Sequence, residues 1–574
     1  MFLAGPFNLE KQPEIQNWFA NENALLFGNG GALAYTLSTE TYQDILNRIP
    51  QGVSIDYLLY FFLENNCIPA GIENSPFPTI AVISDWSINL EAIARVAPFF
   101  SYLLVDYPGV LSLKKLGFEQ VNEVSLFAFN PGGASLNEIP KAYDVSMIGN
   151  LNDVVYEERA RYLKRLTLLG DKYNVKIFAG VFGADCVQVI RSSKITFNHT
   201  IRGEMNVRCF EALAYGSLLF IEDANIECKR YLEDKVHCVY YNEDNFENLI
   251  EHYLNCDKER EAIVQNGFQF IQTIKDTPMQ RLVKKVGEIG KDIRARQPEA
   301  ASWSVDKKAI SRVFHAFNST ERSTRFTYIR DAFPLFNKAE ASYYFAGGLW
   351  FLELSDLAEA SIRVQHLEQC VQWFRKTLDL DPHFVTAYLN LGQAYLKLGR
   401  GDEARASFET GLSQVEQGAQ CDVLATLVHP VYQNEWRMEK DKRFALGEKD
   451  FSKLFLAKLW EGLGDALVTL LKLDRARESY EKALSYEVWE WALYRKVGDT
   501  LVQMNQPQKA IEAYERTLRI RPFYVEVWEV LLRLYRLTDE KNKEEQLREE
   551  IRRIIKCFPS FEPLRTRFVT STNS

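Results

Sequence analysis

The residues whose types and spacing suit chemistry are concentrated in one segment, ITFNHTIRGEMNVRCFEALAYGSLLFIEDANIE (195–227). Its apolar start predicts a strand that ends at Asn198. A polar loop with Arg202 and Gly203 follows, and then a helix over 205–215. A glycine-containing loop that leads into a helix favours anions, because free backbone N–H groups and the helix dipole point at them. The segment therefore predicts a site for a diphosphate.

The charged side chains of this segment are suited to a phosphorylated ligand. On the expected helix Glu204, Arg208 and Glu211 share one face, because they lie at i, i+4 and i+7. Arg202 and Arg208 can donate charge-assisted hydrogen bonds to phosphate oxygens. Glu211 can accept two hydrogen bonds from the vicinal hydroxyls of a ribose. The alternative is that Glu204 and Arg208 form only a solvated ion pair.

Three further residues are candidates because predicted strands end beside them. Gly149 and Asn150 follow an apolar run, and His199 follows the strand that opens the segment. The carboxyl ends of parallel strands are where α/β folds bind ligands, which makes these three residues candidates for a binding site. The other six histidines are unclustered and no acidic triplet ends a strand. The sequence therefore predicts no metal site.

The surrounding chain has an ordinary globular composition. Its 574 residues are 47% hydrophobic and 25% charged, and the net charge of −9 argues against a nucleic-acid partner. Nine cysteines occur without a C-x-x-C pair, which predicts a reducing, cytoplasmic location. The first residues lack the pattern of a signal peptide, and charges interrupt every long apolar run. We therefore expect neither a leader nor a membrane span.

The pattern of elements changes near residue 300. Before it, short apolar runs alternate with helical periodicity, which predicts βαβ units and parallel sheets. We expect two such domains, 1–140 and 141–295, with a weaker pattern in the first 75 residues, and a linker or helical connection at 296–335. The predicted strands are 79–84, 102–105, 144–148, 175–179, 195–198, 217–221 and 238–241.

The second half of the chain contains an internal repeat. Gly464 and Gly498 are 34 residues apart, and each lies in the pattern W-x2-L-G-x2-Y followed by A-x3-F that is typical of tetratricopeptide repeats. Another copy carries Gly392, 72 residues before Gly464, so we expect a divergent or expanded unit between them. The sequence thus predicts an all-α solenoid over 336–556, whose concave surface takes a peptide or protein partner.

The run from Asp144 to about Leu282 resembles the C-terminal half of glycosyltransferases of the GT-B fold, and most of all the spore-maturation CgeB-like group. The FEALAYG core is similar to the E-A-x-A-x-G element of retaining enzymes of that fold. The N-terminal half matches only loosely, through ISDW (83–86) and NPGG (130–133). The stretches that carry the resemblance are YDVSMIGN (143–150), GVFG (180–183), FNHTIRGEMNVRCFEALAYGSLLFIE (197–222) and HCVYYNEDNFENLIEHYL (237–254).

The resemblance implies two Rossmann-like domains that bind a nucleotide-diphosphate sugar in the cleft between them, without a metal or cofactor. It implies that Glu211 holds the donor ribose. The first glutamate of the family's pair would stand eight residues earlier, where this chain has Gly203, and Glu204 is one residue off. The stereochemical outcome therefore stays open. The donor-binding residues implied are Gly149, Asn150, Gly183, Asn198, Arg202, Glu204, Asn206, Arg208 and Glu211.

The acceptor side is expected in the N-terminal domain, where an inverting enzyme needs a general base. No histidine precedes His199, so this base would be a carboxylate. Asp85 and Asp106 follow predicted strands, and Asp85 is the preferred candidate. With His199 it forms the expected catalytic set. The alternative is that Asp85 or Ser87 caps the helix that follows.

We therefore expect a glycosyltransferase that moves a sugar from a nucleotide-diphosphate sugar to a protein or glycan acceptor, with the repeats recruiting the acceptor or another partner. Two alternatives stay open. A scaffold that has lost catalysis would account for the altered glutamate spacing. A dinucleotide-dependent enzyme would need G-x-G-x-x-G after its first strand, and the nearest stretch, 28–31, lacks the third glycine.

Overall fold

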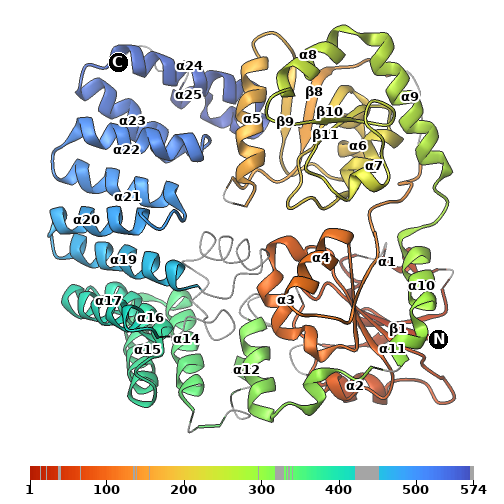
Figure 1. The fold of residues 1–574 in the computed structure, drawn as a ribbon, viewed down its shortest axis with the longest axis horizontal. Coiled ribbons are helices and arrows are strands. Elements are labelled where there is room, and N and C mark those ends of the chain that lie inside the picture. Colours follow the sequence, from red (N-terminus) through yellow and green to blue (C-terminus); the bar gives the residue numbers. More distant parts are fainter. Residues whose placement is uncertain are drawn as a thin grey trace. The chain divides into compact units, whose positions relative to one another are not determined.

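The fold is known from a computed structural model of the chain (Figure 1). Two compact units emerge, one of residues 1–105, 110–123 and 288–513, the other of 106–109, 124–287 and 514–574. The structure describes residues 1–12, 15–20, 22–36, 40–64, 66–133, 136, 139–153, 155–294, 296–316, 329–330, 333, 337–338, 340–419 and 451–568.

A parallel sheet of seven strands, in the order β3-β2-β1-β4-β5-β6-β7, opens the chain. Every residue of β4, β5 and β6 is buried, as expected for central strands of a parallel sheet with helices on both faces. Of these strands the sequence predicted β5 and β6. The strands are β1 (Phe2–Asn8), β2 (Ala24–Asn29), β3 (Leu33–Ala34), β4 (Leu58–Phe61), β5 (Thr79–Val82), β6 (Tyr102–Val105) and β7 (Val121–Glu123).

Helix α12 (Val305–Ala316) belongs to the core of the first unit, because it packs on the buried helix α3 (Leu90–Val96). Arg312 Nη2 lies 2.6 Å from Glu73 Oε2, and His315 Nε2 lies 2.9 Å from the carbonyl oxygen of Leu63. Burial lowers the pKa of His315 to about 4, so its imidazole is neutral at pH 7. Part of the segment predicted as a connection is thus a packed helix.

The second unit contains a parallel sheet of five strands in the order β12-β11-β10-β8-β9. All five were predicted, with ends that differ by one or two residues. Because β8 lies between β9 and β10, the chain reverses its direction of winding there, and the switch point of the sheet lies between β8 and β10. The strands are β8 (Tyr143–Ile148), β9 (Val175–Phe178), β10 (Ser193–Phe197), β11 (Leu218–Glu222) and β12 (Val239–Tyr241).

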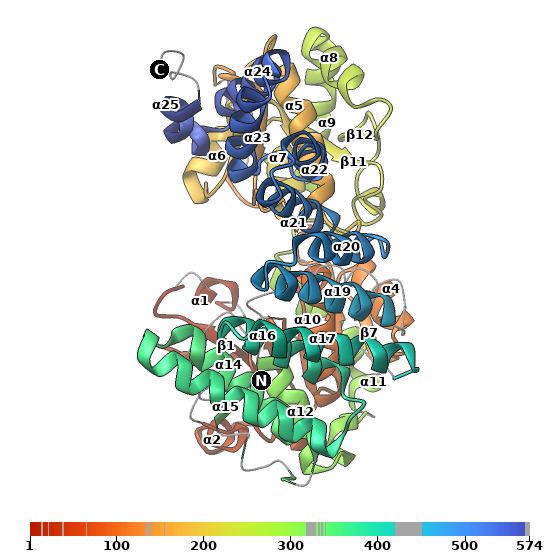
Figure 2. The same ribbon diagram turned by 90° about the vertical axis from the view of Figure 1, so that its left-hand side faces the viewer.

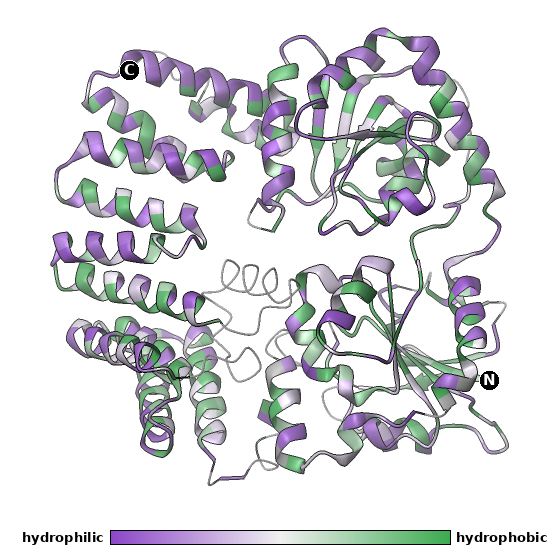
Figure 3. Cartoon of the chain, viewed as in Figure 1, coloured by the Kyte–Doolittle hydropathy of each residue, from purple (hydrophilic) through white to green (hydrophobic). Residues whose placement is uncertain are grey.

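Helices cover both faces of this second sheet. Right-handed crossovers place α5 on one face and α6 and α7 on the other. The helix α8 packs against α5, and α9 packs against α7. Figure 3 shows the strands as mainly hydrophobic and the helices as banded, which is the pattern of one buried and one solvated side. These helices are α5 (Glu157–Leu169), α6 (Gly183–Arg191), α7 (Val207–Ala214), α8 (Phe246–Asn255) and α9 (Asp257–Thr273).

The last helices of the chain are part of this second unit. Helix α24 (Lys541–Cys557) follows α23 (Val525–Leu537) and packs on α5 and on the edge strand β9 (Figures 1 and 2). Lys176 of β9 donates from Nζ to the carbonyl oxygen of Lys556 at 2.6 Å, and Arg521 donates to Asp153 Oδ1 at 2.7 Å. An exposed strand edge is a template for aggregation, so these helices protect the edge of β9.

Paired helices form the repeats of the first unit, as the sequence predicted. The repeated spacing has a steric cause: a Cβ on Gly392 would stand 2.5 Å from the ring of Phe408, and one on Gly464 would stand 2.4 Å from that of Tyr480. The expanded unit expected between these glycines falls on 420–450, outside the described residues. The helices are α14 (Ala341–Leu357), α15 (Ala360–Leu380), α16 (Val385–Lys397), α17 (Gly401–Glu416), α19 (Ser452–Thr469), α20 (Leu473–Leu484) and α21 (Glu490–Gln503).

None of the helices in the described ranges combines the length and the apolar character that a bilayer crossing requires.

The ion pair of Arg521 with Asp153 yields a first prediction. Asp153 is buried, so Arg521→Ala leaves its carboxylate without its charged partner, which should cost about 3 kcal/mol of unfolding free energy in the second unit. Urea unfolding, with hydrogen exchange of α23 and α24, measures this loss. The control is Arg519→Ala, which removes an exposed arginine two residues away. Equal stability of the two variants would contradict the prediction.

Candidate functional site

The candidate site lies at the carboxyl ends of the strands in the second sheet. Two loops flank the switch point: residues 149–156 follow β8, and residues 198–206 follow β10. Arg159 of α5 ties them together, because its Nε donates to the carbonyl oxygen of His199 at 2.7 Å and its Nη1 to that of Asn150 at 3.1 Å. The guanidinium is buried, and desolvation lowers its pKa. The predicted residues Gly149, Asn150, Asn198 and His199 thus lie on two joined loops.

The loop after β10 turns through a left-handed bend. Arg202 has φ 51° and Gly203 has φ 74°. A Cβ on Gly203 would also stand 3.1 Å from the carbonyl oxygen of Ala224, so both the backbone conformation and the available space favour glycine. This explains why the position where the resemblance expects a glutamate carries Gly203.

Two asparagines fix the start of α7. Asn206 Oδ1 accepts a hydrogen bond from Arg208 N at 3.1 Å and so caps the helix. Asn198 Nδ2 donates to the same oxygen at 3.0 Å. Glu227 Oε2 accepts from Met205 N at 2.8 Å, so one N–H group that precedes the helix already has an anionic partner. Asn206 is the residue that joins the two ends of the loop.

The prediction that Glu204, Arg208 and Glu211 share one helix face is wrong for Glu204. Helix α7 begins at Val207, because Asn206 caps it there, and Glu204 therefore lies in the preceding loop. Arg208 pairs instead with Glu211 at i+3, and its Nη1 also lies 2.7 Å from Cys186 Sγ. Its Nε is buried without a hydrogen-bond partner. Arg208 and Glu211 thus form a largely buried pair beside α6, and the solvated ion pair with Glu204 does not form.

Gly183 is the first residue of α6, the helix that carries Cys186. Its φ is 57°, and nothing lies within 4 Å of where its Cβ would be. The preceding Phe182 is 79% exposed, which is unusual for an aromatic ring. The sequence predicted Gly183 as a site residue but not Phe182, because an aromatic residue within an apolar run is expected to be buried in the core.

A buried carboxylate at the end of β11 supports the loop from below. Glu222 Oε1 accepts hydrogen bonds from Thr200 N at 3.1 Å, from the Thr200 hydroxyl, and from Asn225 Nδ2 at 3.1 Å. Asn225 Nδ2 also donates to the carbonyl oxygen of Glu204 at 2.6 Å. The polar run that the sequence predicted at this strand end therefore holds the loop 198–206 in place.

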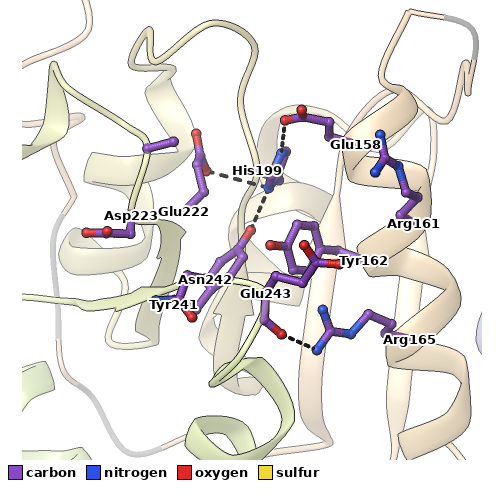
Figure 4. A pocket seen from close by; sticks show the side chains of 11 residues that line it. Glu158, Arg161, Tyr162, Arg165, His199, Glu222, Asp223, Tyr241, Asn242 and Glu243 are labelled. Carbon is purple, nitrogen blue, oxygen red and sulfur yellow. Dashed lines mark hydrogen bonds and ion pairs between the residues drawn. The ribbon is translucent and has the colours of Figure 1, made fainter.

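An open cavity of about 330 Å³ adjoins this loop on the α5 side (Figure 4). His199 lies at its base, and its Nδ1 is 2.8 Å from the hydroxyl of Tyr241. That hydroxyl donates to the carbonyl oxygen of Asn198 at 2.9 Å, and burial raises the pKa of Tyr241. The lining residues are Glu158, Arg161, Tyr162, Arg165, His199, Glu222, Asp223, Ala224, Tyr241, Asn242 and Glu243.

Asp85, the predicted base, lies in the first unit, directly after β5. It occupies the capping position of a 3-10 helix, Trp86–Ile88, but its side chain makes no capping hydrogen bond. The backbone N–H groups of Ser84 and Asp85 donate instead to the buried Glu64, at 3.2 and 3.1 Å. Desolvation raises the pKa of both carboxyls. Sequence reasoning missed Glu64, since it belongs to the irregular first 75 residues.

Asp106, the other acid at a strand end, is already used locally. Its Oδ1 accepts a hydrogen bond from Gly109 N at 2.7 Å, in the first turn of α4 (Tyr107–Lys115). This contact is that of a capping residue, which leaves Asp85 as the candidate base.

Within the described ranges, one group of side chains has the composition of a metal site: His252, Cys256 and Glu259, at the junction of α8 and α9. Glu259 Oε2 lies 2.7 Å from His252 Nε2, whereas Cys256 Sγ lies 3.8 Å from Nδ1. One possible ligand atom from each residue lies within 4.8 Å of the others, and His252 and Glu259 are exposed.

Comparison with protein-family models matches residues 137–284 to a model described as "Glycosyl transferase-like". These residues hold the second sheet, the two loops at its switch point, and the Arg208–Glu211 pair. The second sheet therefore belongs to a glycosyltransferase-like domain. Two models described as tetratricopeptide repeat match residues 352–424 and 461–522. The α/β fold followed by helical repeats is thus confirmed.

Several solved structures are similar to part of this chain. The MamA protein is 17% identical over 41% of this chain and 98% of its own, with a TM-score of 0.26. YrrB, described as a TPR protein with an unusual peptide-binding site, is 18% identical over 37% of this chain and 86% of its own, with a TM-score of 0.25. PilF of Pseudomonas aeruginosa is 12% identical over 46% and 97%, with a TM-score of 0.32. A comparison with curated proteins found no match.

The bend at Gly203 yields a second prediction. Gly203→Ala adds both a left-handed alanine, at about 1 kcal/mol, and a contact with the carbonyl oxygen of Ala224, so the unfolding free energy should fall by about 2 kcal/mol. Gly180→Ala is the matched control, because its φ is 69° but nothing lies within 4 Å of its Cβ position. Urea unfolding compares them. Equal losses would show that the contact with Ala224 has no effect.

Proposed function

We propose that the chain is a glycosyltransferase of the GT-B fold, related to the CgeB-like group, which transfers a sugar from a nucleotide-diphosphate sugar to a protein or glycan acceptor. The single observation that carries this proposal is the largely buried pair of Arg208 and Glu211 at the first turn of α7. The pair lies next to the switch point of the sheet, within the residues that match a glycosyltransferase-like model.

A nucleoside diphosphate offers a hydrogen-bonding partner for each member of this pair. Arg208 can donate to a phosphate oxygen, and Glu211 can accept from the vicinal hydroxyls of a ribose. In the structure each side chain neutralises the other, so ligand binding would exchange one ion pair for contacts to both halves of the nucleotide. Arg202, held in the left-handed bend, supplies a second positive charge on the same loop.

The proposed chemistry places leaving-group stabilisation on protein groups. The N-terminus of α7 and the two arginines would stabilise the departing diphosphate without a metal. Asp85 would remove the proton of the acceptor hydroxyl in an inverting reaction. A raised pKa suits this role, because a general base works best when its pKa approaches the working pH. Glu64 would position Asp85 by binding its backbone N–H.

One observation favours the alternative of a nucleotide-sugar-binding scaffold. Gly203 stands where the family carries its first glutamate, and Glu227 already binds the N–H of Met205 near the start of α7. In that case the protein would act through its repeats, whose paired helices suit a peptide or protein partner. The repeats would recruit the acceptor in the catalytic case and a partner protein in the scaffold case.

Nucleotide binding is the first test. Thermal unfolding with UDP, GDP, CDP and TDP and their common sugars should show one stabilising base, with about 2.7 kcal/mol at 100-fold excess over Kd. Arg208→Ala and Glu211→Ala should each abolish this shift. Arg552→Ala is the matched control, because it removes another i,i+3 pair with a glutamate, on α24. No shift with any nucleotide would overturn the proposed donor site.

Turnover of the donor separates the enzyme from the scaffold. With the stabilising nucleotide sugar, the native chain should release the nucleoside diphosphate, and Asp85→Asn should slow this release by about 10²-fold or more while leaving nucleotide affinity unchanged. Asp56→Asn, an exposed acid that pairs with the N-terminus of the chain, is the control. Nucleotide binding without turnover in the native chain, with acceptors of each class, would favour the scaffold.

A further inference from the structure

We infer that the open cavity between α5 and the ends of β10, β11 and β12 is a separate subsite, and that its ligand is a neutral pyranose ring. The inference rests on the proposed function for the source of that ring, either the sugar of the donor or a sugar of the acceptor. Its chemistry is argued from the cavity alone. At about 330 Å³ the cavity lies at the lower end of the range of small-molecule sites, about 300–1,000 Å³.

Hydrogen-bond acceptors face the base of the cavity. The Tyr241 hydroxyl has one proton, which it donates to the carbonyl oxygen of Asn198. It must therefore accept the hydrogen bond from His199 Nδ1. In the neutral form of the imidazole, Nε2 therefore carries the lone pair. That nitrogen lies 3.7 Å from Glu158 Oε2, on the α5 side of the cavity (Figure 4).

Glu222 supplies a second acceptor, and it is the independent sign of a ligand. Its residue is only 6% exposed, and Oε1 already receives the hydrogen bonds of Thr200 and Asn225. Oε2 has no hydrogen-bond partner and lies 4.0 Å from His199 Nδ1. A buried carboxylate oxygen without a donor is costly, and a ligand hydroxyl would satisfy it.

The charges around the cavity argue against a phosphorylated ligand. The carboxylates of Glu158, Glu222, Asp223 and Glu243 line it. Of the two lining arginines, Arg165 donates from Nε to Glu247 Oε1 at 2.6 Å, and Glu247 lies outside the lining. The excess of negative charge would repel an anion, so this cavity complements the phosphate site proposed at α7.

A neutral polyhydroxylated ring matches the remaining groups. Its hydroxyls can donate to the carboxylates and to His199, and can accept from Arg161 and from the side-chain amide of Asn242. Tyr162, a half-buried ring on the wall of the cavity, offers an aromatic surface for the C–H groups of a pyranose (Figure 4). Because Glu222 also holds Thr200, occupancy of the cavity is linked to the loop 198–206.

The experiment measures binding of free monosaccharides by saturation-transfer NMR, using glucose, galactose, mannose and N-acetylglucosamine. Each is titrated into the full chain, with and without the stabilising nucleoside diphosphate. Glu222→Gln keeps the shape of the side chain and can replace the unpartnered acceptor with a donor, so it should weaken sugar binding at least about tenfold. Glu158→Ala, at a 76% exposed position without risk to folding, should weaken it about threefold. Asp244→Asn, an exposed acid outside the lining, is the matched control and should leave sugar binding unchanged.

The competition pattern identifies the source of the ring. Displacement of the monosaccharide by the nucleotide sugar but not by the nucleoside diphosphate means that the cavity holds the donor sugar. Simultaneous binding of monosaccharide and nucleotide sugar means that it holds an acceptor sugar. Both results support the inference. Absence of sugar binding, equal binding to Glu222→Gln and the native chain, or preferential binding of methylammonium would overturn it. Nucleotide affinity, measured separately, tests the proposed function and not the cavity.

Discussion

The buried guanidinium of Arg159 is the contact on which the candidate site depends. It joins the loop after β8 to the loop after β10 through the carbonyl oxygens of Asn150 and His199. These loops flank the switch point, where the helices diverge to opposite faces and leave the strand ends open. A charge in such a position is stable only when its hydrogen bonds are made. The two hydrogen bonds of Arg159 thus hold both loops in one conformation. Every donor-binding residue that we propose on these loops depends on that conformation.

The two sides of the loop 198–206 differ in charge, although both lie at the same edge of the sheet. On the α7 side Arg208 and Arg202 supply positive charge, and Glu211 is the proposed acceptor for a ribose. On the α5 side carboxylates dominate, and Glu222 presents an oxygen without a hydrogen-bond donor. The loop 198–206 lies between these two environments. His199 is part of this loop, and Glu222 binds it through Thr200. Charge alone would therefore direct an anionic nucleotide to the α7 side of the loop, whereas hydrogen bonding would hold a neutral sugar ring on the α5 side.

The last helices of the chain pack on the glycosyltransferase-like domain within the second unit. Helix α24 covers the edge of β9, and Arg521 reaches Asp153 on the loop that carries Gly149 and Asn150. An open sheet needs a protected edge, and helix α24 protects the edge of β9. This explains why the last helices group with the second sheet although they follow the repeats along the chain.

The sequence by itself determined the second sheet, the repeats and the segment 195–227, because strand alternation, 34-residue spacing and a glycine loop before a helix are local patterns. It did not show β1 to β4, whose short strands lie among glycines and turns, or the start of α7 at Val207, which depends on Asn198 reaching Asn206. Only the tertiary structure placed Cys186 of α6 against Arg208 and brought α5 next to the ends of β10, β11 and β12. Those contacts join residues far apart in the chain, and their partners are chosen by packing and burial, which leave no periodic trace in the sequence.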